Sequence, residues 1–256
     1  MFLVLKGFFH KEVNRSWVWL LVLAVLYSCS KNEQSENIPL YQKILPGSKE
    51  LEIVKKDLHS NKYSKPWGTM VYGLEEIFID NNKYWQLNID FMVNGKASPD
   101  TVYFDAKTLA FYKKSFKNAF SEYTGNLKFE NNKLIGKLAP YTEDSQLKTP
   151  LLYDRVFPHE VFEPAMLNYL LGVLPLKKGY KVSLPMLDLN NGSSIIWANV
   201  EVLGKENVRI KGKKYETWKV LSRGSREKTF WIDTEKKAMI KMENKGVWFQ
   251  WKLNES

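Results

Sequence analysis

The sequence predicts a mainly β fold: a large antiparallel sheet, curved or partly closed like a half-barrel, with one short helix, after an amino-terminal signal segment. Apolar and polar residues alternate along many short segments, and turn residues separate these segments. No alternation of strands with long helices is visible, which argues against a parallel sheet. The 256 residues are 44% hydrophobic and 14% aromatic, which is enough for a substantial core.

The amino terminus has the pattern of a secretory signal peptide over residues 1–28. Lys6, Lys11 and Arg15 precede an unbroken apolar run from Trp17 to Leu26. This run of ten residues is too short to span a bilayer core, which needs about 20. It suits the central region of a signal peptide, which typically has about 7–15 residues.

Cys29 is the expected site of lipid attachment. It follows Leu26, Tyr27 and Ser28, which resembles a bacterial lipobox, although Tyr27 is bulkier than the usual residue there. In that motif the thiol receives a lipid, and a peptidase then cuts before the cysteine. As Cys29 is the single cysteine, the chain forms no internal disulfide. We therefore expect a membrane partner, through the lipid anchor, and a location in the cell envelope, at the outer membrane.

Residues 29–45 follow as an expected flexible tether, because the stretch SKNEQSEN is polar. The chain is basic, with 38 Lys and Arg against 28 Asp and Glu. The basic residues are scattered rather than grouped, which is typical of solvated faces. Export together with this scatter argues against nucleic acid as a partner.

Residues 46–256 form the expected antiparallel β domain. Between residues 83 and 93, Trp85, Leu87, Ile89 and Phe91 recur at every second position, which is the period of a half-buried strand. Asn94-Gly95 follows as a hairpin turn. Further strands of this first meander are expected at 69–80, 101–104, 109–112, 122–129 and 133–138.

A connector between Pro140 and Lys178 contains five prolines and marks a sub-boundary of the domain. Within it, Glu163-Pro164 precedes the apolar segment AMLNYLLGVL, which predicts a short helix that Pro175 ends. Strands then resume, with expected positions at 180–184, 194–203, 207–210, 215–222, 228–232, 238–243 and 247–253.

The second half of the chain resembles an uncharacterised bacterial family of exported proteins, domain-of-unknown-function family 3108. The likeness lies in a helix that ends at Leu174-Pro175-Leu176, in a strand at 217–220 (TWKV), and in the residues Trp231–Asp233 and Lys241–Glu243. The resemblance implies a curved antiparallel sheet similar to lipoprotein-carrier folds. It implies no established activity and no catalytic residue.

The sequence holds few of the patterns that carry catalysis or cofactor binding. The three histidines, His10, His59 and His159, have no zinc-site spacing, and glycine-rich phosphate loops and nucleophile elbows are missing. We therefore expect no metal and no cofactor. A polar group in the connector, with His159 beside Asp154, Arg155, Glu160 and Glu163, leaves open a hydrolase in which His159 is the general base.

Tryptophans are the other candidates for function. Past the signal segment they are Trp67, Trp85, Trp197, Trp218, Trp231, Trp248 and Trp251. Trp197, Trp218 and Trp231 lie on neighbouring expected strands, so they can share one face and contact a ligand. Packing in the core is the alternative role for them.

The leading functional hypothesis is a non-enzymatic envelope lipoprotein that binds an apolar or amphipathic ligand, such as a lipid, glycan or peptide, within the curved sheet. An envelope hydrolase that uses His159 with a nearby carboxylate is one alternative. The other alternative is a structural or assembly lipoprotein that binds a protein partner, which exposed apolar surface on a sheet edge or on the connector would favour.

Overall fold

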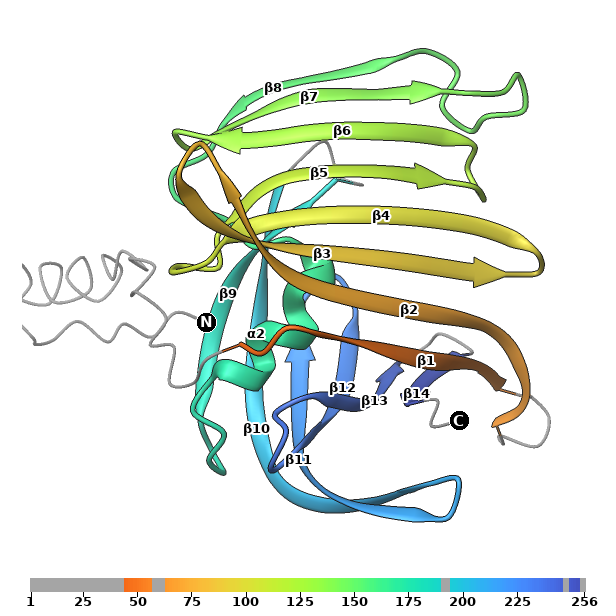
Figure 1. Ribbon diagram of the computed structural model, residues 1–256, viewed down its shortest axis with the longest axis vertical. Coiled ribbons are helices and arrows are strands. Elements are labelled where there is room, and N and C mark those ends of the chain that lie inside the picture. The colour runs from red at the N-terminus through yellow and green to blue at the C-terminus, as the bar shows by residue number, and fades with distance from the viewer. Residues whose placement is uncertain (1–43, 57–62, 190–193, 246–248, 254–256) are drawn as a thin grey trace, which may run out of the picture. The chain divides into compact units, whose positions relative to one another are not determined.

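The computed structural model contains one curved, open sheet of fourteen antiparallel strands and one short helix (Figure 1). The residues it describes are 44–56, 63–189, 194–245 and 249–253. The expected signal peptide, Cys29 and the expected tether as far as residue 43 lie outside the described residues. The predicted fold class is confirmed.

The strands follow one another along the chain as two meanders. The first eight are β1 Gly47–Lys56, β2 Tyr63–Ile79, β3 Asn82–Val93, β4 Lys96–Asp105, β5 Phe111–Asn118, β6 Tyr123–Glu130, β7 Lys133–Pro140 and β8 Leu151–Val156. The last six are β9 Lys181–Asp188, β10 Ser194–Ile210, β11 Lys213–Arg223, β12 Glu227–Asp233, β13 Met239–Asn244 and β14 Phe249–Leu253.

The two meanders join through β1 and β14. Along the sheet the order is β8-β7-β6-β5-β4-β3-β2-β1-β14-β13-β12-β11-β10-β9, so β8 and β9 are the two edges. Because β8 and β9 are neighbours in sequence, the proline-rich connector runs from one edge of the sheet to the other. The strands on both sides of the expected sub-boundary therefore belong to a single sheet.

Two-residue turns set the register of the hairpins. Asn94 and Gly95 both have positive φ, at 51° and 73°, as the prediction of a turn at this point requires. The turn between β2 and β3 is Asp80-Asn81, one residue before the gap between the strands expected at 69–80 and 83–93, and both residues again have positive φ. Turns of this kind match the right-handed twist of paired strands, which explains the Asn-rich and Gly-rich sequence between strands.

The structure corrects the sequence-based strand positions in three places. β10 is a single strand where two were expected, because Leu203 is an extra residue between the paired Val202 and Gly204, and this bulge does not end the strand. β8 lies inside the connector, which was expected to hold only the helix. β1 lies in a segment for which no strand was predicted, and it pairs with both β2 and β14.

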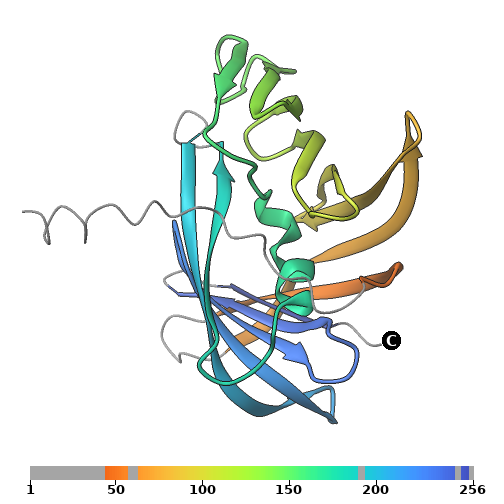
Figure 2. The ribbon, with the colours of Figure 1, turned by 90° about the vertical axis from the view of Figure 1, so that its left-hand side faces the viewer.

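The predicted helix is present as a 3₁₀ turn, Pro164–Met166, that continues into α2, Leu167–Val173. The Glu163 side chain accepts a hydrogen bond from the backbone N–H of Ala165 and so caps the turn. The helix lies on the inner side of the curved sheet (Figure 2). A side chain at Gly172 would meet the carbonyl oxygen of Lys237 at 2.1 Å, so glycine allows the helix to approach the β12–β13 turn.

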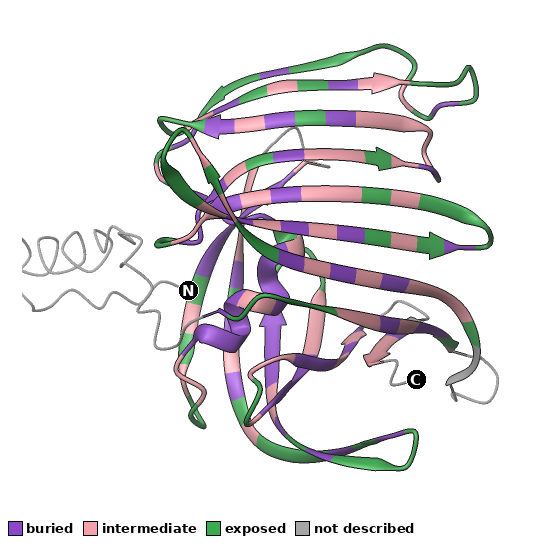
Figure 3. Ribbon diagram, in the orientation of Figure 1, coloured by how far each residue is buried: buried purple, intermediate pink, exposed green. Residues whose placement is uncertain are grey.

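Residues of the inner face and the helix form the main core. Buried residues alternate with less buried ones along β3, where Trp85, Leu87 and Ile89 point inward as predicted (Figure 3). On the outer face a second, smaller cluster consists of Val208, Ile210, Tyr215, Trp231 and Ile240. Curvature thus gives the sheet one large buried face and one mostly solvated face.

Two residues of the connector tie the first meander to β9. The N–H of Phe111 in β5 donates to the carbonyl of Val161 at 2.9 Å. The N–H of Phe162 donates to Pro185, and its carbonyl accepts from Leu187, both at 2.8 Å. These bonds hold the chain extended just before Glu163, and therefore fix where that side chain enters the interior.

Candidate functional site

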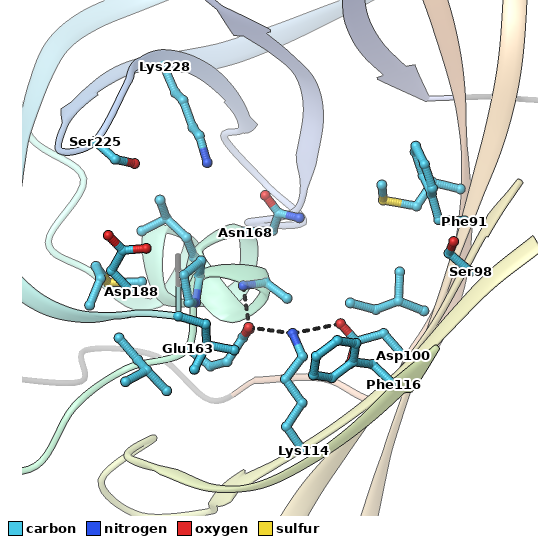
Figure 4. Close-up of a pocket in the computed structure, with 18 of the residues that line it drawn as sticks. Phe91, Ser98, Asp100, Lys114, Phe116, Glu163, Asn168, Asp188, Ser225 and Lys228 are labelled. Carbon is cyan, nitrogen blue, oxygen red and sulfur yellow. Dashed lines mark hydrogen bonds and ion pairs between the residues drawn. The ribbon is translucent and has the colours of Figure 1, made fainter. Parts of the chain in front are cut away.

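A cavity of about 570 Å³ lies between the helix and the inner faces of strands from both meanders. Its apolar wall includes Met70, Ile89, Phe91, Leu167, Phe230 and Met242. Most of its polar groups come from β4 and β5, the start of the helix and the β11–β12 hairpin, and β9 adds Asp188 (Figure 4). Apolar walls with a few convergent polar groups are typical of small-molecule sites.

Lys114 is the centre of a buried charge cluster on one wall. Its Nζ lies 2.6 Å from Oε1 of Glu163 and 2.7 Å from Oδ2 of Asp100 (Figure 4). The other oxygen of Glu163, Oε2, accepts the N–H of Ala165 at 2.5 Å. Three segments that are distant in sequence are therefore joined by one ammonium group.

Asp100 has one oxygen that takes no part in the ion pair with Lys114. Its Oδ1 is buried and has no hydrogen-bond partner among the described residues. Burial raises the pKa of the Asp100 carboxyl to about 6; Lys114 works against this shift, and the negative Glu163 adds to it. Burial alone would lower the pKa of the Lys114 ammonium, but Glu163 and Asp100 outweigh burial and hold it above its usual value.

The opposite wall is formed by the β11–β12 hairpin and presents a different kind of lysine. Lys228 extends into the cavity with its amine at the tip, and Ser225 from the adjoining turn lies on the same side (Figure 4). Burial lowers the pKa of the Lys228 ammonium; Glu163 raises it and Arg226 lowers it further. No hydrogen bond or ion pair to the side-chain ammonium of Lys228 is found in the part of the chain that the structure describes.

The helix is attached to β2 at the edge of the cavity. Nδ2 of Asn168 donates to the hydroxyl of Tyr72 at 3.1 Å, and both residues line the cavity. Burial is the main reason that the pKa of Tyr72 lies above its usual value. This hydrogen bond satisfies two buried polar groups and holds the helix against the first meander.

The three tryptophans singled out from the sequence do not share a face. Trp218 pairs with Ile232 and packs against the main core on the inner side. Trp231 pairs with Lys219 and belongs to the outer cluster, where the Lys241 ammonium lies 4.2 Å from its ring centroid. Trp197 contacts the ring of His159 at 5.5 Å. None of the three lines the cavity, whereas Trp251 does, so ligand binding by the three stays a prediction.

The polar group of the connector is divided in the structure. Glu163 reaches the cavity, but His159 does not line it. Nδ1 of His159 lies 2.8 Å from the carbonyl oxygen of Glu160, and Asp154 forms an ion pair with Lys133. The convergence of His159 with a carboxylate in a cleft, which the hydrolase alternative requires, is therefore not present at this cavity.

Sequence analysis missed Asp100, Lys114 and Lys228. A lysine on an inward-facing position of an alternating strand is the signal that identifies Lys228, because Phe230 and Ile232 share its face. Asp100 precedes Val102 and Phe104 in the same way. Lys114 gives no such signal, because a bulge in β5 shifts its pairing with β4 between Phe111 and Lys113.

Two further observations concern membranes and metals. Among the described residues, no helix is long and apolar enough to cross a membrane. Within the same residues, no group of three or more His, Cys, Asp or Glu side chains is placed to hold a metal ion.

An open, curved antiparallel sheet with a helix on its inner face defines a class of β-barrel-like domains. A solved structure of this class is the "Beta-barrel-like Protein of Domain of Unknown Function DUF1849 from Brucella abortus". It is 16% identical, with a TM-score of 0.52, and the match covers 83% of this chain and 97% of that one. At this identity the likeness shows the fold alone.

The chain itself belongs to the family described as "Protein of unknown function (DUF3108)". The family profile matches residues 78–245. The match confirms the resemblance found in the second half and extends it into the first meander, as far as β2. No curated protein matches the sequence.

Proposed function

We propose that this chain is a lipid-anchored envelope protein that binds an apolar or amphipathic ligand in the cavity of its curved sheet, without catalysing a reaction. The observation that supports binding is the cavity of about 570 Å³, which lies within the range of about 300–1,000 Å³ common for small-molecule sites. Its wall is apolar over several strands, and charged and polar groups from several elements converge on it.

Native mass spectrometry of the protein purified from its own bacterium tests ligand binding. We expect a bound lipid or other amphiphile of defined mass. A titration with alkyl maltosides of increasing chain length then measures the apolar contribution. Affinity should rise by about 0.8 kcal/mol, or about fourfold, for each added methylene until the cavity is full.

A larger side chain inside the cavity should block the ligand, and the same change at an exposed position provides the control. Ala198 is buried and lines the cavity, whereas Ala97 is exposed on β4. Ala198→Phe should weaken alkyl maltoside binding, and Ala97→Phe should not. Circular dichroism confirms that both variants fold. Equal binding by a folded Ala198→Phe variant would remove this cavity as the ligand site.

The anchor is supported by the lipobox-like residues before Cys29 and by the polar stretch after it. Growth of a bacterial host with an alkyne-labelled fatty acid should label the full chain and bring it to the membrane fraction. Cys29→Ala should lose the label. A labelled Cys29→Ala variant would contradict lipidation at this residue.

A structural role with a protein partner is the second candidate, because the edge strand β8 exposes apolar side chains. Leu152 and Val156 are 73% and 71% exposed, and an edge strand leaves backbone groups available for pairing. A photo-crosslinking residue at position 152 should then capture a protein in cells, while the same residue at the exposed Phe78 should not. Equal capture at both positions would argue against a specific edge contact.

A further inference from the structure

The cavity presents charges of both signs, and their pairing shows which are already neutralised. Asp100 and Glu163 both bind the Lys114 ammonium, so the two carboxylates on this wall already contact a cation. Asp188, the remaining acidic residue of the lining, also has an interaction partner.

The basic residues at the β11–β12 hairpin differ. Lys228 and Arg226 line the cavity, and neither has an ion pair among those found for residues 44–56, 63–189, 194–245 and 249–253. The nearby Arg223 and Lys245, by contrast, both contact Glu227 on the solvated side of the hairpin. The acidic residue of the hairpin, Glu227, is therefore paired on the solvated side, and Lys228 and Arg226 remain without an ion pair at the cavity.

We infer that the cavity binds an amphiphile with a single apolar chain and an anionic head, and that Lys228 is the anchor of the head. This inference rests on the proposed ligand-binding function and names its ligand class. The apolar wall of Phe230, Met242 and Ile89 receives the chain, and the Lys228 ammonium meets the carboxylate or phosphate. Ser225 adds a hydroxyl donor on the same side (Figure 4).

An anionic head relieves an electrostatic cost that the empty cavity carries. A partly buried ammonium without a partner is destabilised by lost solvation, and Arg226 nearby adds repulsion. A ligand carboxylate or phosphate restores the lost contacts through a charge-assisted hydrogen bond. A ligand with a cationic head should bind more weakly, since the Asp100 carboxylate that it would meet is already bound to Lys114.

Calorimetric titration of the purified protein with four amphiphiles of equal chain length tests the inference: dodecanoate, dodecyl phosphate, dodecyl maltoside and dodecylamine, each below its micelle concentration. We expect both anions to bind more tightly than the neutral maltoside, and the amine to bind most weakly. Inorganic phosphate alone should not displace dodecanoate, because the chain supplies most of the affinity.

Substitutions locate the anchor. In Lys228→Gln the ratio of dodecanoate affinity to maltoside affinity should fall about tenfold, the usual value of a hydrogen bond to a charged group. Lys228→Arg should retain the ratio, because it keeps the charge. The matched control, Lys214→Gln, changes an exposed lysine of β11 that pairs with β10, and it should also leave the ratio unchanged.

The outcomes separate the inference from the proposed function. If the maltoside binds but the anions show no preference, or the amine binds most tightly, the anionic-head inference fails and ligand binding stands. If none of the four amphiphiles binds, the proposed function fails as well. Displacement of dodecanoate by inorganic phosphate would show that the site binds a free anion, and would refute the inference that its ligand is an amphiphile.

Discussion

The two walls of the cavity differ in how they surround a lysine: Lys114 is buried, and Lys228 is partly buried. On the β4–β5 wall, Lys114 lies within 2.7 Å of two carboxylates from distant segments. On the β11–β12 wall, Lys228 faces the cavity, and none of the ion pairs found for the described residues includes it. The first lysine holds the fold together, while the second is available to a ligand.

This difference shows how one cavity separates stability from recognition. A buried charge that is fully paired locks the segments that supply its partners, in this case β4, β5 and the start of the helix. A partly buried charge that is unpaired lowers the stability of the free protein, and a ligand of opposite charge restores that stability on binding. The comparison therefore predicts opposite signs for the same substitution on the two walls.

Loss of the Lys114 ammonium should have the largest effect. Lys114→Met leaves Asp100 and Glu163 close together and buried without their cation, which should lower the free energy of unfolding by about 3–5 kcal/mol. Urea unfolding followed by tryptophan fluorescence measures it. The adjacent Lys113 is exposed, so Lys113→Met should change stability by less than about 0.5 kcal/mol. Equal effects of the two substitutions would refute a structural role for the cluster.

The alternation of apolar residues was sufficient to predict the antiparallel sheet, while Glu163-Pro164 predicted the helix and Asn94-Gly95 predicted the turn that follows β3. It was not sufficient to place Lys114. A strict period of two from the inward Phe111 puts Lys113 inside and Lys114 outside. In the structure Tyr103 pairs with Lys113 but Phe104 pairs with Phe111, so Tyr112 is an extra residue that reverses the faces. Nothing local in the sequence marks this bulge.

The meeting of Glu163 with Lys114 was beyond sequence reasoning for a second reason. The two residues are 49 positions apart, and the connector must first reach β9 before Glu163 can turn inward. The sequence indicated Glu163 as the acidic residue that starts a helix and as one of the carboxylates near His159, but not as a partner of Lys114. Tertiary hydrogen bonds to Phe111, Pro185 and Leu187 decide where that helix begins in space.

The pH dependence of stability is the next test of the β4–β5 wall, where Lys114 is paired with two carboxylates. The pKa of Asp100 rises from 3.8 to about 6 on folding, so the folded state holds this proton more tightly than the unfolded chain. Its contribution to stability is fully present below about pH 4 and is lost as the pH rises through about 6. The free energy of unfolding of the native protein, relative to Asp100→Asn, should therefore fall by about 2 kcal/mol across this range.

Urea unfolding of both proteins at several pH values measures that difference, and the subtraction cancels the other carboxylates. Glu201, Glu206, Glu216 and Glu227 have lowered pKa values and act in the opposite direction in both proteins. Parallel pH profiles for the native protein and Asp100→Asn would show that Asp100 does not titrate in this window.

The smallest expected change in stability is a gain rather than a loss, and it concerns Lys228 on the β11–β12 wall. Lys228→Met removes an ammonium whose pKa burial has lowered and keeps the apolar stem, so the ligand-free protein should become more stable by about 1 kcal/mol. Urea unfolding measures this gain, and Lys214→Met, at an exposed position of β11 that pairs with β10, should give none. A loss of stability in Lys228→Met would mean that Lys228 has a structural partner, and the contrast between the two walls would disappear. If Lys228→Met is more stable than the native protein but binds dodecanoate more weakly, the Lys228 ammonium lowers the stability of the free protein and strengthens ligand binding.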